Sequence, residues 1–403
     1  MASDFEILGS NARMILDSRG NPTVECEIYL SYAMGRCSAP SGASTGKAEA
    51  VAFPEGGAAR SIEFFNEKVK RSVIGFNSLD QSGFDNMLRD IDGTDNFSRM
   101  GGNLATALSM ACAKAVSNAM GIPLYRYVGG MLLSVPRPLG NVIGGGKHAR
   151  NGTTIQEFMV SAEGSTFLDS ILVNSKVHRR IGELLQDRLK GQAIGMGDER
   201  AWAVSMKDDE AIDVIIQAAK EVSTETKTKV GVASDFAASS YYKDGKYHYH
   251  DRSLTQDEQI DFSISLIKER GFFLLEDPMD EVDFDGFASI TSSVGNRAVI
   301  VGDDLYTTRS DLIRKGITKK STNAVLIKVN QVGTLSQAAE AVETTRLAGW
   351  KSVISHRSGE TTDDFIAHLA VGFRADMIKS GTVGGERLAK LNEVVRIQED
   401  LIS

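Results

Sequence analysis

A series of apolar, strand-like segments in this sequence ends each time in an ionisable residue, and such residues can perform acid–base and metal chemistry. The residues at these ends are Glu199, Asp235, Glu276, Asp303, Lys328, His356 and Lys379, and Glu157 lies inside the first segment. A single charged residue after an apolar strand is usually a solvated loop residue or a helix N-cap. The repetition along the chain favours a shared site instead.

Three of these residues, Asp235, Glu276 and Asp303, follow consecutive segments and offer the hard oxygen ligands that Mg²⁺ prefers. Two lysines and a histidine end the next segments, so the site would be acidic on one side and cationic on the other. Abstraction of a proton alpha to a carboxylate needs a base and a cation that holds the doubly charged enolate. A lysine between a second lysine and metal ions has a lowered pKa and can act as that base. Lys328 and Lys379 fit this description.

The elements that must position these residues are short β-rich runs, which alternate with amphipathic helical stretches from about residue 139 onward. The runs are Thr154–Ser161, Gln192–Glu199, Lys229–Asp235, Phe272–Glu276, Val299–Asp303, Ala324–Lys328, Ser352–His356 and Ala375–Lys379. Their number and spacing predict a closed βα barrel, in which the C-terminal strand ends converge on one face. An open doubly wound sheet is the rival fold, but no GxGxxG follows a first strand.

The sequence before the barrel predicts a smaller α+β unit over residues 1–128, with the barrel over residues 139–403. Apolar and polar residues alternate from Thr23 to Leu30, which is typical of a half-buried antiparallel strand. The Ala- and Met-rich run from Leu104 to Met120 predicts a helix that ends at Gly121. We therefore expect an N-terminal domain that caps the barrel.

Composition limits the function further. The chain has 403 residues, 42% of them hydrophobic, and a net charge of -8, which argues against a nucleic-acid-binding protein. Its three cysteines, Cys26, Cys37 and Cys112, show no CxxC spacing and fit a reducing cytoplasm. No signal-peptide pattern and no apolar run of about 18 residues occurs, so we expect a protein of the cytoplasm without a membrane span.

Short motifs spread along the chain resemble those of the enolase family. They are DSRGNPTVE from Asp17, PSGASTG (40–46), GGKHA (145–149), QEFM (156–159), GDE (197–199), EDP (276–278), GDDL (302–305), LIKVNQVGT (326–334), SHRSGET (355–361) and IKSG (378–381). Each motif alone is weak, but the ordered set is specific. The segment from Ser380 to Arg387 lacks the Arg-Ser pair of bacterial and eukaryotic members and resembles the archaeal ones.

The resemblance implies an enolase-type barrel and the reversible, Mg²⁺-dependent dehydration of 2-phospho-D-glycerate to phosphoenolpyruvate in glycolysis and gluconeogenesis. It implies that Lys328 removes the C2 proton and that Glu199 protonates the departing C3 hydroxyl. It assigns the other roles as follows: the first Mg²⁺ to Asp235, Glu276 and Asp303; the second to Ser44; the leaving-group side to Gln156, Glu157 and His148; a further catalytic position to His356; the phosphate to Arg357 and Ser358; and the substrate carboxylate to Lys379. A homodimer or higher homo-oligomer, with an ion pair between Glu25 and Arg396 of two subunits, is also implied.

Other functions compete with this one. Arg200 follows Glu199 where many enolases have a small residue, and a cation there would lower the pKa of the proton donor. The alternative is therefore an enolase-fold protein with impaired catalysis that serves a binding or scaffold role. A superfamily member acting on another carboxylate is disfavoured by the intact SHRS segment. An NTPase is excluded because Ser41 and Ala48 interrupt the Walker A pattern.

Overall fold

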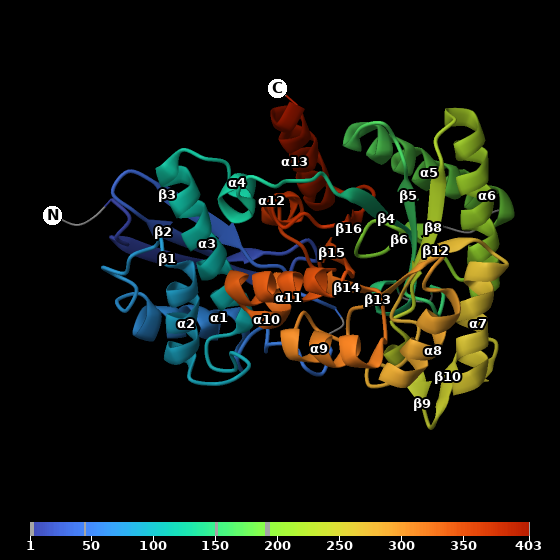
Figure 1. Cartoon of the computed structure of the whole chain (residues 1–403), viewed down its shortest axis with the longest axis horizontal. Coiled ribbons are helices and arrows are strands. Elements are labelled where there is room, and N and C mark those ends of the chain that lie inside the picture. Colours follow the sequence, from blue (N-terminus) through green and yellow to red (C-terminus); the bar gives the residue numbers. More distant parts are fainter. Residues whose placement is uncertain (1–3, 44–45, 150–151, 190–193, 403) are drawn as a thin grey trace.

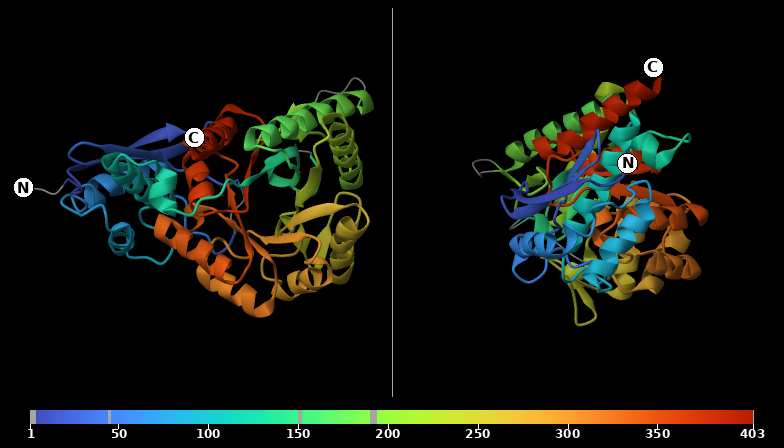
Figure 2. Two further views of the ribbon diagram at one scale, coloured as in Figure 1. Left: turned by 45° about the horizontal axis from the view of Figure 1, so that its top comes forward. Right: turned by 90° about the vertical axis from the view of Figure 1, so that its left-hand side faces the viewer.

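The structure of this protein, a computed structural model, describes residues 4–43, 46–149, 152–189 and 194–402. The chain forms a smaller N-terminal α+β part and a closed βα barrel that lie side by side (Figures 1 and 2). The predicted fold class is therefore confirmed. The last helix returns across the outside of the barrel toward the N-terminal part (Figure 1).

The N-terminal part packs a three-stranded antiparallel sheet against helices. Its elements are β1 (Gly9–Leu16), β2 (Pro22–Tyr29), β3 (Met34–Ser38), α1 (Gly57–Phe64), the π-helix η1 (Phe65–Val69), α2 (Gln81–Asp92), α3 (Gly102–Met120) and α4 (Leu124–Gly129). The strand and the helix predicted here are confirmed as β2 and α3. Gly35 lets the sheet approach α3 closely, because a Cβ atom there would lie 2.0 Å from the carbonyl oxygen of Ala111.

The barrel consists of eight strands in one closed sheet. They are β4 (Arg137–Gly144), β5 (Glu157–Ala162), β8 (Val230–Asp235), β12 (Phe272–Glu276), β13 (Val299–Gly302), β14 (Ala324–Ile327), β15 (Lys351–Ser355) and β16 (Met377–Gly381). Pairing of β16 with β4 closes the ring. Strand β5 is antiparallel to both of its neighbours, whereas the other barrel strands pair in parallel.

One predicted strand is wrong. The first two residues of the run Gln192–Glu199 lie outside the described residues, and of the described part, 194–199, only Gly195–Met196 forms a strand, β6, which pairs with β7 (Trp202–Ala203) in a small hairpin. The place of this run in the barrel is taken by β4, whose Pro138, Gly140 and Gly144 are poor strand formers. Tertiary burial overrides that propensity, because β4 is buried along nearly its whole length.

The register of β4 with β5 shifts between Asn141 and Ile143, as in a β-bulge. Bulges bend a strand and change the direction of a neighbouring side chain. The reversal of β5 has a second effect, because it brings the first residue of this strand, Glu157, to the end of the barrel where the parallel strands finish.

Helices cover the outside of the barrel (Figure 1). They are α5 (Phe167–Arg188), α6 (Asp208–Thr226), α7 (Gln256–Lys268), α8 (Phe284–Val294), α9 (Ser310–Lys319), α10 (Val329–Val332), α11 (Leu335–Leu347), α12 (Phe365–Gly372) and α13 (Gly385–Ile402). Shorter elements are η2 (Gly146–His148), η3 (Ala238–Ser240), β9 (Tyr242–Lys243), β10 (Lys246–His248) and β11 (Ser253–Thr255). Within the described ranges, no helix is both long enough and apolar enough to cross a membrane.

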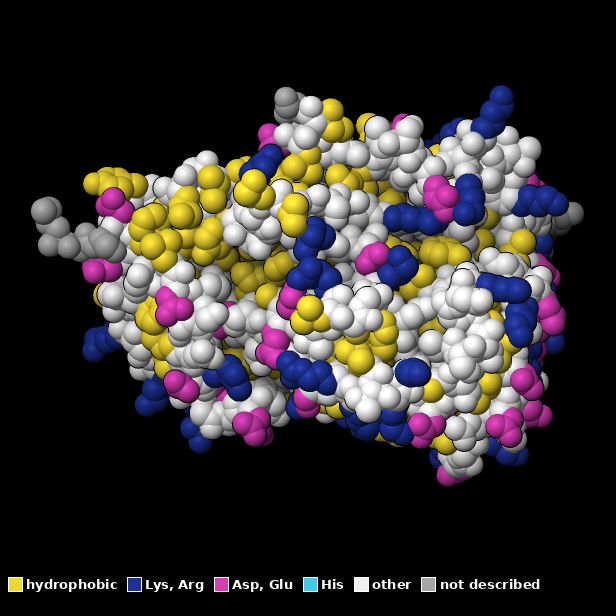
Figure 3. Space-filling view, viewed as in Figure 1, with side chains coloured by type: hydrophobic (Ala, Val, Ile, Leu, Met, Phe, Trp, Pro, Cys, Tyr) yellow, Lys and Arg dark blue, Asp and Glu magenta, His cyan; other side chains and the backbone are white. Residues whose placement is uncertain are grey.

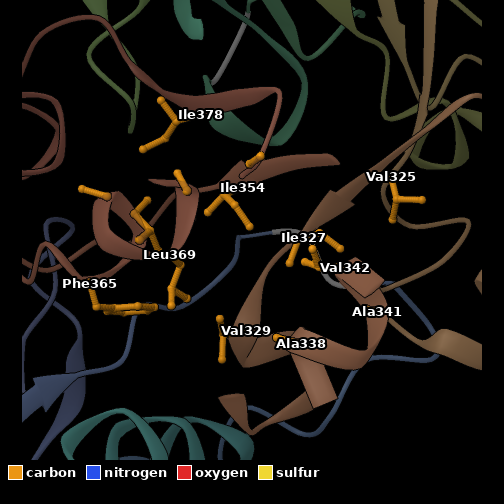
Figure 4. Close-up of a cluster of buried hydrophobic side chains, with 14 of the residues drawn as sticks. Val325, Ile327, Val329, Ala338, Ala341, Val342, Ile354, Phe365, Leu369 and Ile378 are labelled. Atoms are coloured by element: carbon orange, nitrogen blue, oxygen red, sulfur yellow. The ribbon is translucent and has the colours of Figure 1, made fainter. Parts of the chain in front are cut away.

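Two hydrophobic clusters hold the barrel rigid. Outward-facing residues such as Ile327 and Ile354 pack against Val342 of α11 and Leu369 of α12 (Figure 4). A second cluster fills the inside of the barrel and is formed by Leu139, Met159, Ala233, Leu274, Val301, Ala324, Leu326, Val353 and Met377. Because successive strand residues alternate between these clusters, the residue that ends each strand has a fixed direction.

Candidate active site

A polar cavity lies at the barrel end where the parallel strands finish. Most of the predicted site residues line it, namely His148, Gln156, Glu157, Glu199, Asp235, Asp303, Lys328, His356, Arg357, Ser358 and Lys379. Glu276 adjoins it through an ion pair with Lys379. Ser44, predicted as a ligand of a second Mg²⁺, lies outside the described residues.

Lys379 is the centre of the acidic side. Its Nζ lies 2.8 Å from Glu276 Oε2, 3.0 Å from Asp235 Oδ2 and 3.2 Å from Glu157 Oε2. Burial alone would lower the pKa of Lys379, but the surrounding carboxylates, led by Asp235, raise it well above its usual value. In this arrangement Lys379 is a charged group and not a base.

Lys328 donates a hydrogen bond from Nζ to Asp303 Oδ2. Burial acts to lower the pKa of Lys328, yet Asp303 raises it overall. Direct contact with Asp303 here outweighs repulsion from Arg357 and Lys379, whereas the lowered pKa expected from the sequence depends on metal ions beside the lysine. Withdrawal of Asp303 from this contact is therefore a condition for Lys328 to act as a base.

Asp235, Glu276 and Asp303 fit a metal site. They end or follow the adjacent strands β8, β12 and β13. Burial, and then repulsion from Asp235, raises the pKa of Glu276 well above its usual value, and the buried Oε1 atom of Glu276 has no hydrogen-bond partner among the described residues. A divalent cation would supply the missing partner and relieve the repulsion between the carboxylates.

A second acidic group adjoins this one. Asp277, Asp303 and Asp304 each offer a carboxylate oxygen within 4.8 Å of the others. Asp277, which sequence analysis did not single out, accepts hydrogen bonds from the backbone N–H groups of Asp303 at 2.9 Å and Asp304 at 2.7 Å. These two hydrogen bonds fix the end of the strand that precedes Asp303. Asp277 itself adopts a left-handed backbone conformation with a φ of 42°.

Glu199 and two histidines form a further group in the cavity. His148 Nδ1 lies 3.1 Å from Glu157 Oε1 and 3.5 Å from Glu199 Oε1, and His356 Nε2 lies 3.2 Å from Glu199 Oε2. The amide of Asn141 donates to Glu199 Oε2 at 3.1 Å. Asn141 was not predicted, because an asparagine inside a strand with poor strand formers carries no distinct signal.

Burial would raise the pKa of Glu199, but His356, His148 and Arg387 together lower it well below its usual value. The arginine that acts on Glu199 is therefore Arg387 on α13. Arg200 is exposed, adopts a left-handed φ of 62°, and packs its aliphatic stem over Gly384. The sequence-based interpretation assigned this influence to the neighbour in sequence, whereas it comes from a helix 188 positions further on.

Arg357 and Ser358 lie at the rim, where β15 passes into the next loop. Arg357 Nη2 lies 3.0 Å from Glu49 Oε2, and Nη1 donates to Asn330 at 2.9 Å. Ser358 Oγ accepts a hydrogen bond of 2.6 Å from the N–H of Ala43. Glu49 was missed by sequence analysis, although it closely follows the glycine-rich segment at 40–46. These contacts join the N-terminal part to the barrel at the cavity.

Comparison with known proteins agrees with this geometry. The enolase C-terminal TIM barrel domain matches residues 132–403, and the enolase N-terminal domain matches residues 7–128. The enolase of Thermoplasma acidophilum is 60% identical over 97% of this chain and 98% of its own. The Picrophilus torridus enolase is 58% identical over 99% of this chain and 100% of its own, and the Archaeoglobus fulgidus enolase is 45% identical over 96% of each. The chain belongs to the enolase family.

Proposed function

We propose that this protein catalyses the reversible, Mg²⁺-dependent dehydration of 2-phospho-D-glycerate to phosphoenolpyruvate, as a carbon–oxygen lyase of glycolysis and gluconeogenesis. The observation that carries the proposal is that Lys328, paired with Asp303, and Glu199, next to two histidines, line the same cavity. A base and an acid in one cavity are what removal of a proton and a hydroxyl from adjacent carbons requires.

In the proposed reaction, the neutral Nζ of Lys328 takes the C2 proton. The C3–O bond then breaks as the C2=C3 double bond forms, and the departing hydroxide receives the proton of Glu199 to leave as water. A divalent cation held by Asp235, Glu276 and Asp303 would supply the positive charge that stabilises the enolate and lowers the pKa of nearby Lys328. The cofactor we propose is Mg²⁺, at two sites per subunit, with Ser44 as a ligand of the second.

The remaining residues bind the substrate. Arg357 offers a planar fork to the phosphate, next to the hydroxyl of Ser358. Lys379, charged and buried, neutralises the substrate carboxylate. Gln156, Glu157 and His148 line the side from which water leaves. Because the substrate is anionic, its binding opposes the cations that lower the pKa of Glu199 and favours the protonated form that an acid needs.

The oligomer we propose is a homodimer or a larger assembly of such dimers. The side chain of Arg396 is 66% exposed and binds only Glu393 among the contacts of the described residues, which leaves its outer side open to Glu25 of a second subunit. Hydrophobic side chains gather on the N-terminal part in Figure 3. The N-terminal residues Met14, Leu16 and Tyr32 are exposed. Such exposure is typical of interaction surfaces.

Two further assignments belong to this proposal. We treat residues 1–128 as a domain that caps the barrel of residues 139–403. We place the protein in the cytoplasm, since its three cysteines are unpaired and buried, as in reducing compartments.

Turnover by the purified protein tests the function. Addition of 2-phosphoglycerate and Mg²⁺ should raise the ultraviolet absorbance of phosphoenolpyruvate, and a chelator should abolish the increase. Binding of 2-phosphoglycerate without turnover would contradict the proposal and support a binding or scaffold role.

A further inference from the structure

Arg387 is a fully buried arginine that no sequence motif singled out. It lies in the first turns of α13 and reaches two loops of the cavity. Nη2 donates to the carbonyl oxygen of Ser358 at 2.6 Å and to that of Asp198 at 3.2 Å, and Nη1 donates to the carbonyl oxygen of Arg357. A guanidinium costs free energy when it leaves water, so such a residue needs these partners. Its position connects the loop before Glu199 with the loop after β15.

The second contact of Nη1 is a ring nitrogen. Nη1 lies 2.8 Å from His356 Nδ1, and the backbone N–H of Gly381 also points at this atom, at 3.3 Å. A guanidinium and a backbone N–H can only donate hydrogen bonds. Nδ1 must therefore be the acceptor of both, and it carries no proton.

The single proton of the ring is then on Nε2, because a histidine with an unprotonated Nδ1 is the neutral Nε2–H tautomer. Nε2 faces Glu199, whose Oε2 is 3.2 Å away. The proton of Nε2 therefore lies on the side of the ring that faces this carboxylate. We propose that Arg387 is a positioning residue that keeps His356 neutral, with its only proton on Nε2 and directed at Glu199.

The charges around His356 oppose one another. Burial and Arg387 disfavour the imidazolium, whereas Glu199 and, at longer range, Glu157 favour it, and the net effect is a lowered pKa of His356. A neutral histidine next to two carboxylates is unusual, because a carboxylate ordinarily draws a second proton onto the ring. Burial is the largest of these effects on the pKa of His356, and the guanidinium on the other ring nitrogen adds to it.

The chemical consequence rests on the function proposed above. His356 has no second proton to give, so it does not pass a proton to the leaving group. Its Nε2–H faces Oε2 of Glu199, to which the amide of Asn141 donates a hydrogen bond, and Oε1 lies on the side of His148. The acid then has one oriented oxygen for the reaction, and Arg387 determines this orientation through His356.

The tautomer can be measured without turnover. The protein is labelled with ¹⁵N at its six histidines, and the resonances of His356 are assigned by their loss in His356→Asn. At neutral pH we expect the Nδ1 resonance of an unprotonated nitrogen and the Nε2 resonance of a protonated one. A proton on Nδ1, in either a neutral or a charged ring, would overturn the proposal even if no variant of Arg387 could be made.

Arg387→Gln tests the cause. Removal of the positive charge should let His356 bind a second proton at a higher pH than in the wild type, and should lower kcat by about tenfold or more with little change in KM. The matched control is Lys390→Gln. Lys390 is buried one turn further along α13 and anchors the same loop through Glu360, at 2.8 Å, without contacting His356.

The control should lose thermal stability, as Arg387→Gln does, and keep the wild-type signals of His356. If the two variants shifted the His356 titration equally, or if neither did, the role of Arg387 would be purely structural. Absence of turnover in the wild type would instead contradict the proposed function and leave the tautomer measurement valid.

Discussion

Lys379 Nζ lies 2.8 Å from Glu276 Oε2, and both side chains are buried at the centre of the barrel mouth. Asp235 and Glu157 surround the same ammonium group. One cation thus neutralises part of a cluster of three carboxylates, and the cluster keeps an excess of negative charge. The excess is the physical reason for a divalent cation at this place, and it makes the stability of the protein sensitive to Lys379.

Replacement of Lys379 by Met should destabilise the protein by about 3 to 5 kcal/mol, the cost of breaking a buried ion pair. Added Mg²⁺ should restore more stability to this variant than to the wild type, because the carboxylates lack their internal cation. Urea unfolding with and without Mg²⁺ measures both effects. The control is Lys351→Met, whose half-exposed pair with Asp376 should contribute less than about 1 kcal/mol.

Separate steps are assigned to Lys328 and Glu199, so their variants should differ. Glu199→Gln should slow phosphoenolpyruvate formation by about 10² to 10⁴-fold, as expected when a general acid is lost, but should still exchange the C2 proton with solvent. Lys328→Ala should lose both activities. Mass spectrometry of 2-phosphoglycerate recovered from deuterated buffer measures the exchange. Exchange that persists in Lys328→Ala would show that another residue is the base.

Arg200→Gly should change kcat/KM by less than about twofold, or about 0.4 kcal/mol. The arginine is exposed, and the cation next to Glu199 is Arg387. Glycine also suits the φ of 62° at this position, so we expect equal or slightly higher thermal stability. A large rate gain in this variant would revive the interpretation that the natural enzyme is impaired.

Glu27 should make folding sensitive to acid. Burial raises the pKa of Glu27, but Arg13, Tyr29 and Arg36 lower it to about 2. A carboxylate whose pKa is lower in the folded state stabilises the protein above its unfolded pKa, and this contribution is lost as the pH falls from about 5 toward 2. Urea unfolding at several pH values measures how much unfolding free energy the protein loses on acidification. This loss should be smaller in Glu27→Gln than in the wild type, by about 1 to 2 kcal/mol after solvent screening. An unchanged dependence would contradict this assignment.

The fold was predictable where the sequence pattern and the burial agree. The strands that carry Asp235 and Glu276 are apolar runs that end in a carboxylate, and the structure has them at the predicted residues. Strand β4 was missed because its proline and glycines hide a buried strand, and Gln192–Glu199 was taken for a strand in its place. The strand propensity of its residues fails to predict β4, because burial within the closed sheet stabilises this strand.

Site residues that lie within the sequence motifs could be predicted. The charged groups that act on these residues could not. Glu199 was found by a motif although the strand assigned to it was wrong. Arg387, Glu49 and Asn141 were missed because each acts across a large separation in sequence, and a charged residue on a helix is ordinarily solvated. The ion pair of Lys328 with Asp303 was not predicted either, since such a contact cannot be inferred from spacing.

The irregular register between β4 and β5 determines where insertions and deletions can be tolerated in this chain. The extra residue of β4 lies between Asn141 and Ile143, next to the side chain that donates to Glu199. A deletion in this strand would rotate Asn141 away from Glu199, and a slip of one residue in β5 would turn Glu157 out of the cavity. Surface loops can vary in length at little cost, whereas the register of β4 with β5 disfavours insertions and deletions within these two strands.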